Sequence, residues 1–140
     1  MIRKLTILLL IFITSICKSQ VVYNFEGGTL TGWLQIPDTH WATSTTTPIS
    51  GSYSLKHTYN SSVDATDRVS IALPAWNPNS GDVTWQLKVR HGYDPSSTNR
   101  WWIYLMADQD ANQMVAGGSI SGYVVGVNLT GSDDLLKLWR

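Results

Sequence analysis

The chain has 140 residues, enough for one domain, and its 10 Lys and Arg residues balance its 10 Asp and Glu residues. This neutral balance produces no basic field, which argues against a nucleic-acid partner recruited through its phosphate groups. Only 14% of the residues are charged and seven are Trp, so the composition favours a secreted, aromatic-rich β protein over a disordered chain or a cytosolic enzyme.

The first 19 residues have the pattern of a secretory signal peptide. A short basic start precedes an apolar run over 5–16, and small residues at Cys17 and Ser19 precede a cleavage site before Gln20. The apolar run is too short for a comfortable membrane span. The alternative is a lipoprotein with Cys17 as the lipidated residue, but such a site needs a small residue where Ile16 stands.

Cleavage before Gln20 changes the charge and the redox chemistry of the chain. Arg3, Lys4 and Lys18 leave with the signal peptide, so the mature net charge is about −3, and Cys17, the only cysteine, leaves too. The mature protein therefore uses no disulfide and no thiolate. We expect a bacterial protein that passes through the periplasm, is secreted or held at the cell surface, and does not insert into a membrane after cleavage.

After residue 20, side chains alternate with a period of two rather than with a helical period, which predicts short β-strands. The expected strands cover 21–26, 32–36, 40–43, 52–59, 68–73, 83–90, 100–107, 123–129 and 135–139. Turn-rich segments separate them, so residues 20–140 are predicted to form one all-β, antiparallel sandwich or barrel.

Within the two central strands, one set of alternating side chains is expected to form the core. This inward set consists of Trp85, Leu87, Trp101, Ile103 and Leu105. The last expected strand runs to Arg140 with no turn residues after it, which would leave an apolar strand without a partner. We therefore expect a truncated reading frame or the N-terminal part of a larger protein.

Two motifs near the start of the mature chain resemble the opening of jelly-roll modules. The segments 24–33 (NFEGGTLTGW) and 51–56 (GSYSLK) resemble carbohydrate-binding modules, MAM domains and related concanavalin A/laminin-G-like sandwiches. Segments 90–96 and 122–136 resemble the N-terminal sandwich of large bacterial exoproteins that end in a type IX secretion sorting domain. The resemblance implies an antiparallel jelly-roll β-sandwich, incomplete at its C-terminus, in which Phe25 and Trp33 are core aromatics rather than ligand contacts.

The sequence offers little support for catalysis. Concanavalin A-like β-glucanases use a Glu-x-Asp-x-x-Glu strand, and Glu26 is the only glutamate of this chain. A serine-nucleophile elbow is excluded because Ile120 occupies the centre of the nearest match. The histidines, His40, His57 and His91, are far apart in the sequence and suggest no nucleophile–base pair. The prediction is a non-catalytic protein without a cofactor.

One segment carries the oxygen-ligand spacing that opens a calcium loop. Asp108, Asp110 and Asn112 stand at alternate positions, but Gln113 and Ser119 occupy the places where an EF-hand needs Gly and Glu. These three residues are therefore candidate ligands for a structural calcium ion in a loop of another design. The alternative is an Asp- and Asn-rich surface turn without metal.

A second face of the central strands is the candidate glycan site. If 83–90 pairs with 100–107 as a hairpin, polar and aromatic side chains meet on that face, and a residue of the 123–129 strand can join them. A sugar ring stacks on an aromatic plane while amide and cationic groups bind its hydroxyls. The candidate contacts are Gln86, Lys88, Arg90, Trp102, Tyr104 and Asn128. The alternative is that Trp102 and Tyr104 are covered by other parts of the protein and serve only in packing.

Three functions remain open at this point. The first is a secreted, non-catalytic module that binds a glycan or another surface polymer. The second is a structural or adhesive spacer of a larger exoprotein, without a small ligand. The third is an accessory domain of an enzyme whose catalytic part lies elsewhere.

Overall fold

The computed structural model describes residues 20–140 except 76, 78, 80, 116 and 117, so the expected signal peptide lies outside the described residues. The described part of the chain forms seven strands and no helix. No helix in these residues therefore has the length and apolar character needed to cross a membrane. The strands are β1 (Trp33–Ile36), β2 (Trp41–Ser44), β3 (Ser54–His57), β4 (Arg68–Ile71), β5 (Trp101–Ala107), β6 (Gly122–Val127) and β7 (Leu136–Trp139).

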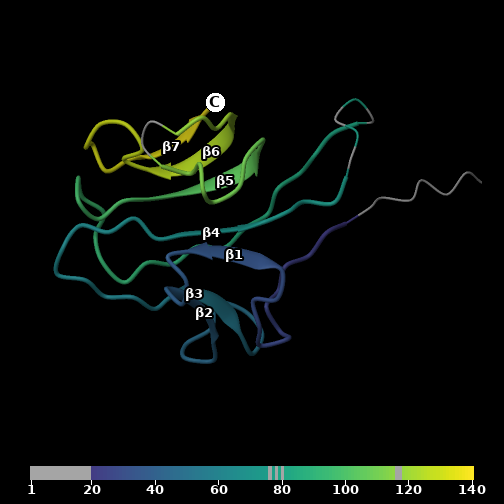
Figure 1. Ribbon diagram of the computed structural model, residues 1–140, viewed down its shortest axis with the longest axis horizontal. Coiled ribbons are helices and arrows are strands. Elements are labelled where there is room, and N and C mark those ends of the chain that lie inside the picture. The colour runs from purple at the N-terminus through teal and green to yellow at the C-terminus, as the bar shows by residue number, and fades with distance from the viewer. Residues whose placement is uncertain (1–19, 76, 78, 80, 116–117) are drawn as a thin grey trace, which may run out of the picture.

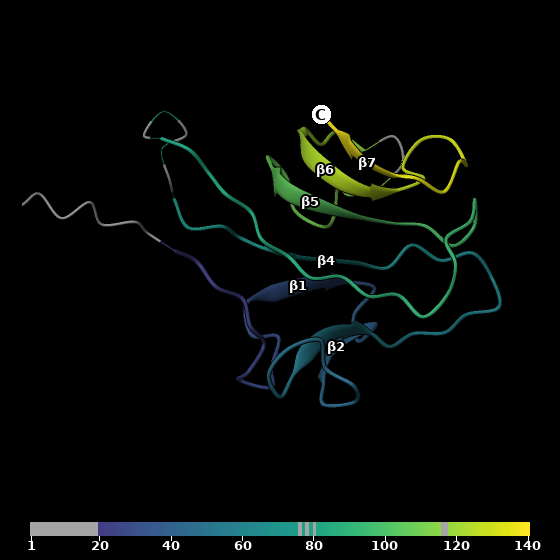
Figure 2. The same cartoon turned by 180° about the vertical axis from the view of Figure 1, so that it is seen from behind.

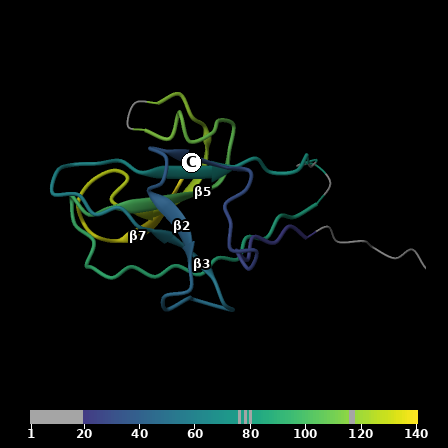
Figure 3. The same cartoon turned by 60° about the horizontal axis from the view of Figure 1, so that its bottom comes forward.

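The strands pair antiparallel in three small sheets, which confirms the predicted all-β class. Strand β1 pairs with β4, β2 pairs with β3, and β5, β6 and β7 form a three-stranded sheet with β6 at its centre. The β5–β6–β7 sheet lies on one side of the molecule and the β2–β3 hairpin on the other, with β1 and β4 between them (Figures 1 and 2). Figure 3 shows the β2–β3 hairpin from its outer side.

Most expected strands are present, somewhat shorter than predicted, but two are not. Residues 21–26 and 83–90 form no strand. The predicted hairpin between 83–90 and 100–107 is therefore wrong, and β5, at the edge of its sheet, pairs with β6. Residues 81–90 are exposed throughout, and their alternating side chains gain no sheet neighbour on either side.

The pairing of β5 with β6 depends on glycine. Trp102 lies opposite Gly126 in the antiparallel register. A Cβ at Gly126 would come within 2.5 Å of the Cα of Trp102 and 2.6 Å of its Cβ. Only a residue without a side chain lets the two backbones approach this closely. Gly126 thus allows the close pairing of β5 with β6 at Trp102.

The buried apolar core is small and centred on β6. In the described part of the chain, the fully buried apolar residues are Ala111, Val124 and Val127, with exposed fractions of 0%, 4% and 4%. The expectation that Trp85 and Leu87 are core is wrong, since they are 40% and 47% exposed. They lie on a segment that has no paired strand to bury them. Trp101, Ile103 and Leu105 of β5 are half-buried.

The segment 24–33 is hydrogen-bonded to the distant turn at 51–53. The Glu26 carboxylate accepts hydrogen bonds from the backbone N–H groups of Ser52 at 3.0 Å and Tyr53 at 3.2 Å. Gly51 has a φ of +64°, and a Cβ there would collide with the Glu26 carboxylate. The Phe25 and Trp33 rings lie 5.5 Å apart. Glu26 therefore stabilises the turn at 51–53, and the contact between Phe25 and Trp33 is a packing contact.

Candidate functional site

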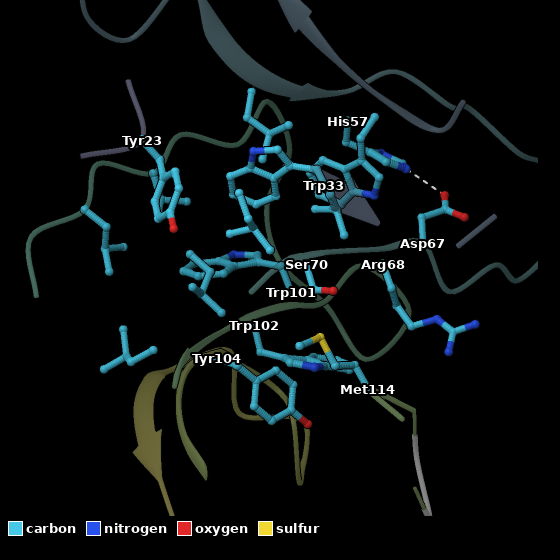
Figure 4. Close-up of a pocket in the computed structure, with 18 of the residues that line it drawn as sticks. Tyr23, Trp33, His57, Asp67, Arg68, Ser70, Trp101, Trp102, Tyr104 and Met114 are labelled. Carbon is cyan, nitrogen blue, oxygen red and sulfur yellow. Dashed lines mark hydrogen bonds and ion pairs between the residues drawn. The ribbon is translucent and has the colours of Figure 1, made fainter. Parts of the chain in front are cut away.

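A large hollow separates the sheets of the molecule. Its volume is about 3810 Å³, and aromatic residues from three distant segments line it: Tyr23, Trp33 of β1, and Trp101, Trp102 and Tyr104 of β5 (Figure 4). Pockets for small molecules usually measure about 300–1,000 Å³. The hollow is several times larger than such a pocket.

Trp102 and Tyr104 are two positions apart in β5 and therefore lie on the same face of the strand. Both border the hollow. Tyr104 lies opposite Val124, which is buried. Burial raises the pKa of the Tyr104 hydroxyl above its ordinary value, so this hydroxyl stays protonated at neutral pH and can donate a hydrogen bond. The guanidinium carbon of Arg100 lies 5.8 Å from the centre of the Trp102 ring. This corner of the hollow combines two aromatic surfaces with hydrogen-bond donors.

The polar side chains expected beside them come from the extended segment at 83–90. Gln86, Lys88 and Arg90 are exposed and border the same hollow as Trp102 and Tyr104, although no hairpin joins the two segments. The Arg90 guanidinium donates to the backbone carbonyl and the hydroxyl of Thr47, which links this segment to the turn after β2. Gln86 and Lys88 are exposed too and have no such hydrogen-bond partner among the described residues.

Asn128 does not reach the hollow, which corrects its expected place among the sugar contacts. It is 1% exposed and has a φ of +58°, in the left-handed region that Asn tolerates better than most residues. Its amide nitrogen donates to the Asp134 carboxylate at 2.6 Å, and its amide oxygen accepts from the Asp134 backbone N–H at 3.0 Å. Asn128 therefore closes the turn between β6 and β7.

We expect Asn128→Ala to lower the free energy of unfolding by about 2 kcal/mol, since it removes two hydrogen bonds and leaves the Asp134 carboxylate without its amide partner. Urea denaturation measures this loss. Asn112→Ala is the control, because Asn112 is exposed and its side chain hydrogen-bonds only to nearby Asp110. If Asn128→Ala leaves the free energy of unfolding unchanged but abolishes ligand binding, Asn128 belongs to the binding site after all.

The candidate calcium ligands are engaged in local hydrogen bonds. The Asp110 carboxylate accepts from the backbone and side-chain amides of Asn112, both at 2.9 Å. The Asp108 carboxylate accepts from the backbone N–H of Ser121 at 2.8 Å. No three His, Cys, Asp or Glu side chains in the described ranges form a group that could hold a metal ion. These contacts are typical of a turn that its own side chains stabilise.

Two histidines and one aspartate form a cluster that the sequence did not predict. The Asp67 carboxylate lies 2.6 Å from the Nδ1 atom of His40 and 2.6 Å from the Nε2 atom of His57. An ionised carboxylate only accepts hydrogen bonds, so both ring nitrogens donate to it. The His40 ring also stacks on Tyr59, with ring centres 3.7 Å apart. The cluster joins the β2–β3 hairpin to the start of β4.

The environment of Asp67 favours its charged form. Its side chain is 7% exposed, and this burial alone would raise the pKa of its carboxyl. The hydrogen bonds from His40 and His57, together with their charge, outweigh burial and hold the pKa below its ordinary value. The hairpin register, which sets Trp41 opposite His57, could have suggested that the histidines are neighbours. Nothing in the sequence indicates that the β4 end joins them.

Contacts between β4 and the loop after β5 connect the two sides of the hollow. The Arg68 guanidinium donates to the carbonyls of Ala111 at 3.0 Å and Asn112 at 3.2 Å. The backbone N–H of Ala111 donates to the Ser70 hydroxyl at 3.0 Å. Because Ala111 is fully buried, these contacts fix the β4 strand against the loop.

Comparisons with known proteins give no assignment. The chain matches no protein-family model, no curated protein and no solved structure.

Proposed function

We propose that this protein is a secreted, non-catalytic β-sandwich module of the jelly-roll type that binds a glycan in the hollow beside β5. One observation carries the proposal: Trp102 and Tyr104 border a hollow that is also lined by Gln86 and Lys88. Stacking surfaces and amide or ammonium donors that line one hollow are a combination that suits a saccharide. The hollow is large enough for several sugar units, which favours a polysaccharide at or outside the cell surface.

The proposal assigns separate roles to the lining residues. Trp102 and Tyr104 supply apolar planes for the faces of sugar rings, and the protonated Tyr104 hydroxyl donates to a sugar oxygen. Gln86 supplies both a donor and an acceptor, and Lys88 supplies donors. No covalent step is involved, so binding depends on the fit of the surface and on the water that it releases.

Replacing Trp102 by Ala is expected to weaken glycan binding at least tenfold, because it removes a stacking plane and a tenfold change corresponds to about 1.4 kcal/mol. Affinity electrophoresis in gels containing single polysaccharides measures the effect. Trp102→Phe retains a ring and should keep most of the binding. Tyr104→Ala should weaken binding as well.

The matched control is Leu138→Ala. Leu138 is an apolar side chain on β7 that is 65% exposed and does not border the hollow. The Leu138→Ala variant should migrate as the parent protein does in every gel. If the parent protein and the Trp102→Ala and Tyr104→Ala variants are retarded equally, Trp102 and Tyr104 do not bind the glycan.

A second candidate function is a structural or adhesive spacer in which a polypeptide segment fills the hollow. Its support is the small buried core, together with the exposed apolar side chains of Trp85 and Leu87. A spacer predicts no retardation in any polysaccharide gel. The same electrophoresis experiment therefore separates the two functions.

A further inference from the structure

We propose that the glycan of the hollow is an acidic one, and that Arg100 binds its carboxylate groups while the sugar ring stacks on Trp102. This inference rests on the proposed glycan-binding function and narrows the class of ligand. It is carried by the geometry of the Arg100–Trp102 pair and by the pairing of the carboxylates around the hollow.

Arg100 stands immediately before β5 and borders the hollow. Its guanidinium carbon lies over one face of the Trp102 ring, 5.8 Å from the ring centre, so the cation and the proposed stacking residue are in cation–π contact. In the part of the chain that the structure describes, no acceptor hydrogen-bonds to this guanidinium. A guanidinium presents planar, paired N–H donors that match the two oxygens of a carboxylate. A uronate ring placed on Trp102 would bring its carboxylate to these donors.

The carboxylates that border the hollow are mostly engaged by the protein itself. Glu26 accepts from backbone amides of the turn at 51–53, and Asp67 is paired with His40 and His57. Asp108 and Asp110 accept from local N–H groups. These carboxylates therefore have hydrogen-bond partners within the protein.

The remaining charges on the lining nearly balance. Asp64 and Asp82 border the hollow, and so do Lys56 and Lys88. Charge over the whole hollow consequently does not select for an anion. The selection proposed here is local to Arg100, where the guanidinium and the Trp102 ring act together on one sugar unit.

The test compares polygalacturonate with its fully methyl-esterified form, which has the same backbone but no charge. Binding of each polymer to the full chain is measured by isothermal titration calorimetry at two salt concentrations. We expect the parent protein to bind polygalacturonate at least tenfold more tightly than the ester. We expect Arg100→Gln to abolish this preference while binding of the ester is unchanged, and Arg100→Lys to retain part of it.

Arg140→Gln is the matched control. Arg140 also lies 5.8 Å from an aromatic ring, that of Tyr123, and the substitution makes the same change of charge, but Arg140 does not border the hollow. It should leave the preference unchanged. If polygalacturonate and its ester bind equally tightly, the proposal of an acidic ligand is wrong, but the proposal of glycan binding is kept. If neither these polymers nor any other polysaccharide binds, the proposed function itself fails. Tighter binding of dextran sulfate than of polygalacturonate would overturn the assignment to carboxylates.

Discussion

Replacing Asp67 by Asn is expected to lower the free energy of unfolding by about 3 kcal/mol at pH 7, because it removes the charge that two imidazoles share. The Asn amide nitrogen would also face a ring N–H donor, which leaves one histidine without an acceptor. His40 is 15% exposed and should account for most of the loss. His57 is 43% exposed, so solvent screens its share.

Thermal or urea denaturation of Asp67→Asn should be compared with that of Asp133→Asn. Asp133 also has a lowered pKa, caused by its hydrogen bond from Lys137, but this pair is exposed. We therefore expect Asp133→Asn to change stability only slightly. Equal losses of stability in the two variants would show that the buried cluster stabilises the fold no more than the exposed Asp133–Lys137 pair does.

The pH dependence follows from the direction of the Asp67 shift. The folded protein holds the pKa of Asp67 below its ordinary value. The stabilisation is therefore fully present above the unfolded-state pKa of about 3.9 and is lost as the pH falls through the lower, folded-state pKa. The difference in stability between the parent protein and Asp67→Asn should shrink over this acidic range. A difference that stays constant down to pH 2 would contradict the assigned cause.

Replacing Gly126 by Ala is expected to cost about 3 kcal/mol, at the upper end for an overpacked site, because the new Cβ collides with the backbone of Trp101 and Trp102. Strand β5 can relieve the collision only by moving away from β6, which breaks the pairing that positions Trp102. Chemical denaturation measures the loss. Glycan binding by the folded fraction should weaken as well.

Gly27→Ala provides the matched control for this effect. A Cβ at Gly27 meets no atom of the described chain within 4 Å. We expect the change in stability to stay within about 0.5 kcal/mol, as is usual for a surface substitution. If Gly126→Ala is tolerated as well as Gly27→Ala, the close approach of β5 to β6 is not a constraint on the fold.

The alternation of side chains predicted the strand content of this chain well, because a period of two follows directly from strand geometry. The segments that became β1, β2, β5 and β7 were each placed within about two residues. Alternation does not specify which strands pair. The sequence around 83–90 has the pattern of a strand but forms none. Strand β5 lies at the edge of its sheet and pairs with β6, where Gly122 and Gly126 leave room for the β5 backbone.

The candidate site was predicted only where it depends on one strand. Trp102 and Tyr104 lie two positions apart on β5, so their common face could be read from the alternation. Asn128 was misplaced because the strand ends at Val127 and the chain then turns, which buries the amide against Asp134. The His40–Asp67–His57 cluster joins three segments that are distant in the sequence, and no spacing rule reveals such a contact.

Binding of a glycan in the hollow is tested most directly by the indole N–H signals of the tryptophans in NMR spectra during a titration with polygalacturonate. Trp101 and Trp102 border the hollow, whereas the Trp139 indole donates to Thr130 outside it. We predict saturable shifts of the Trp101 and Trp102 signals and an unchanged Trp139 signal. Shifts confined to Trp139, or no shift at any indole while binding is observed, would contradict a glycan site beside β5.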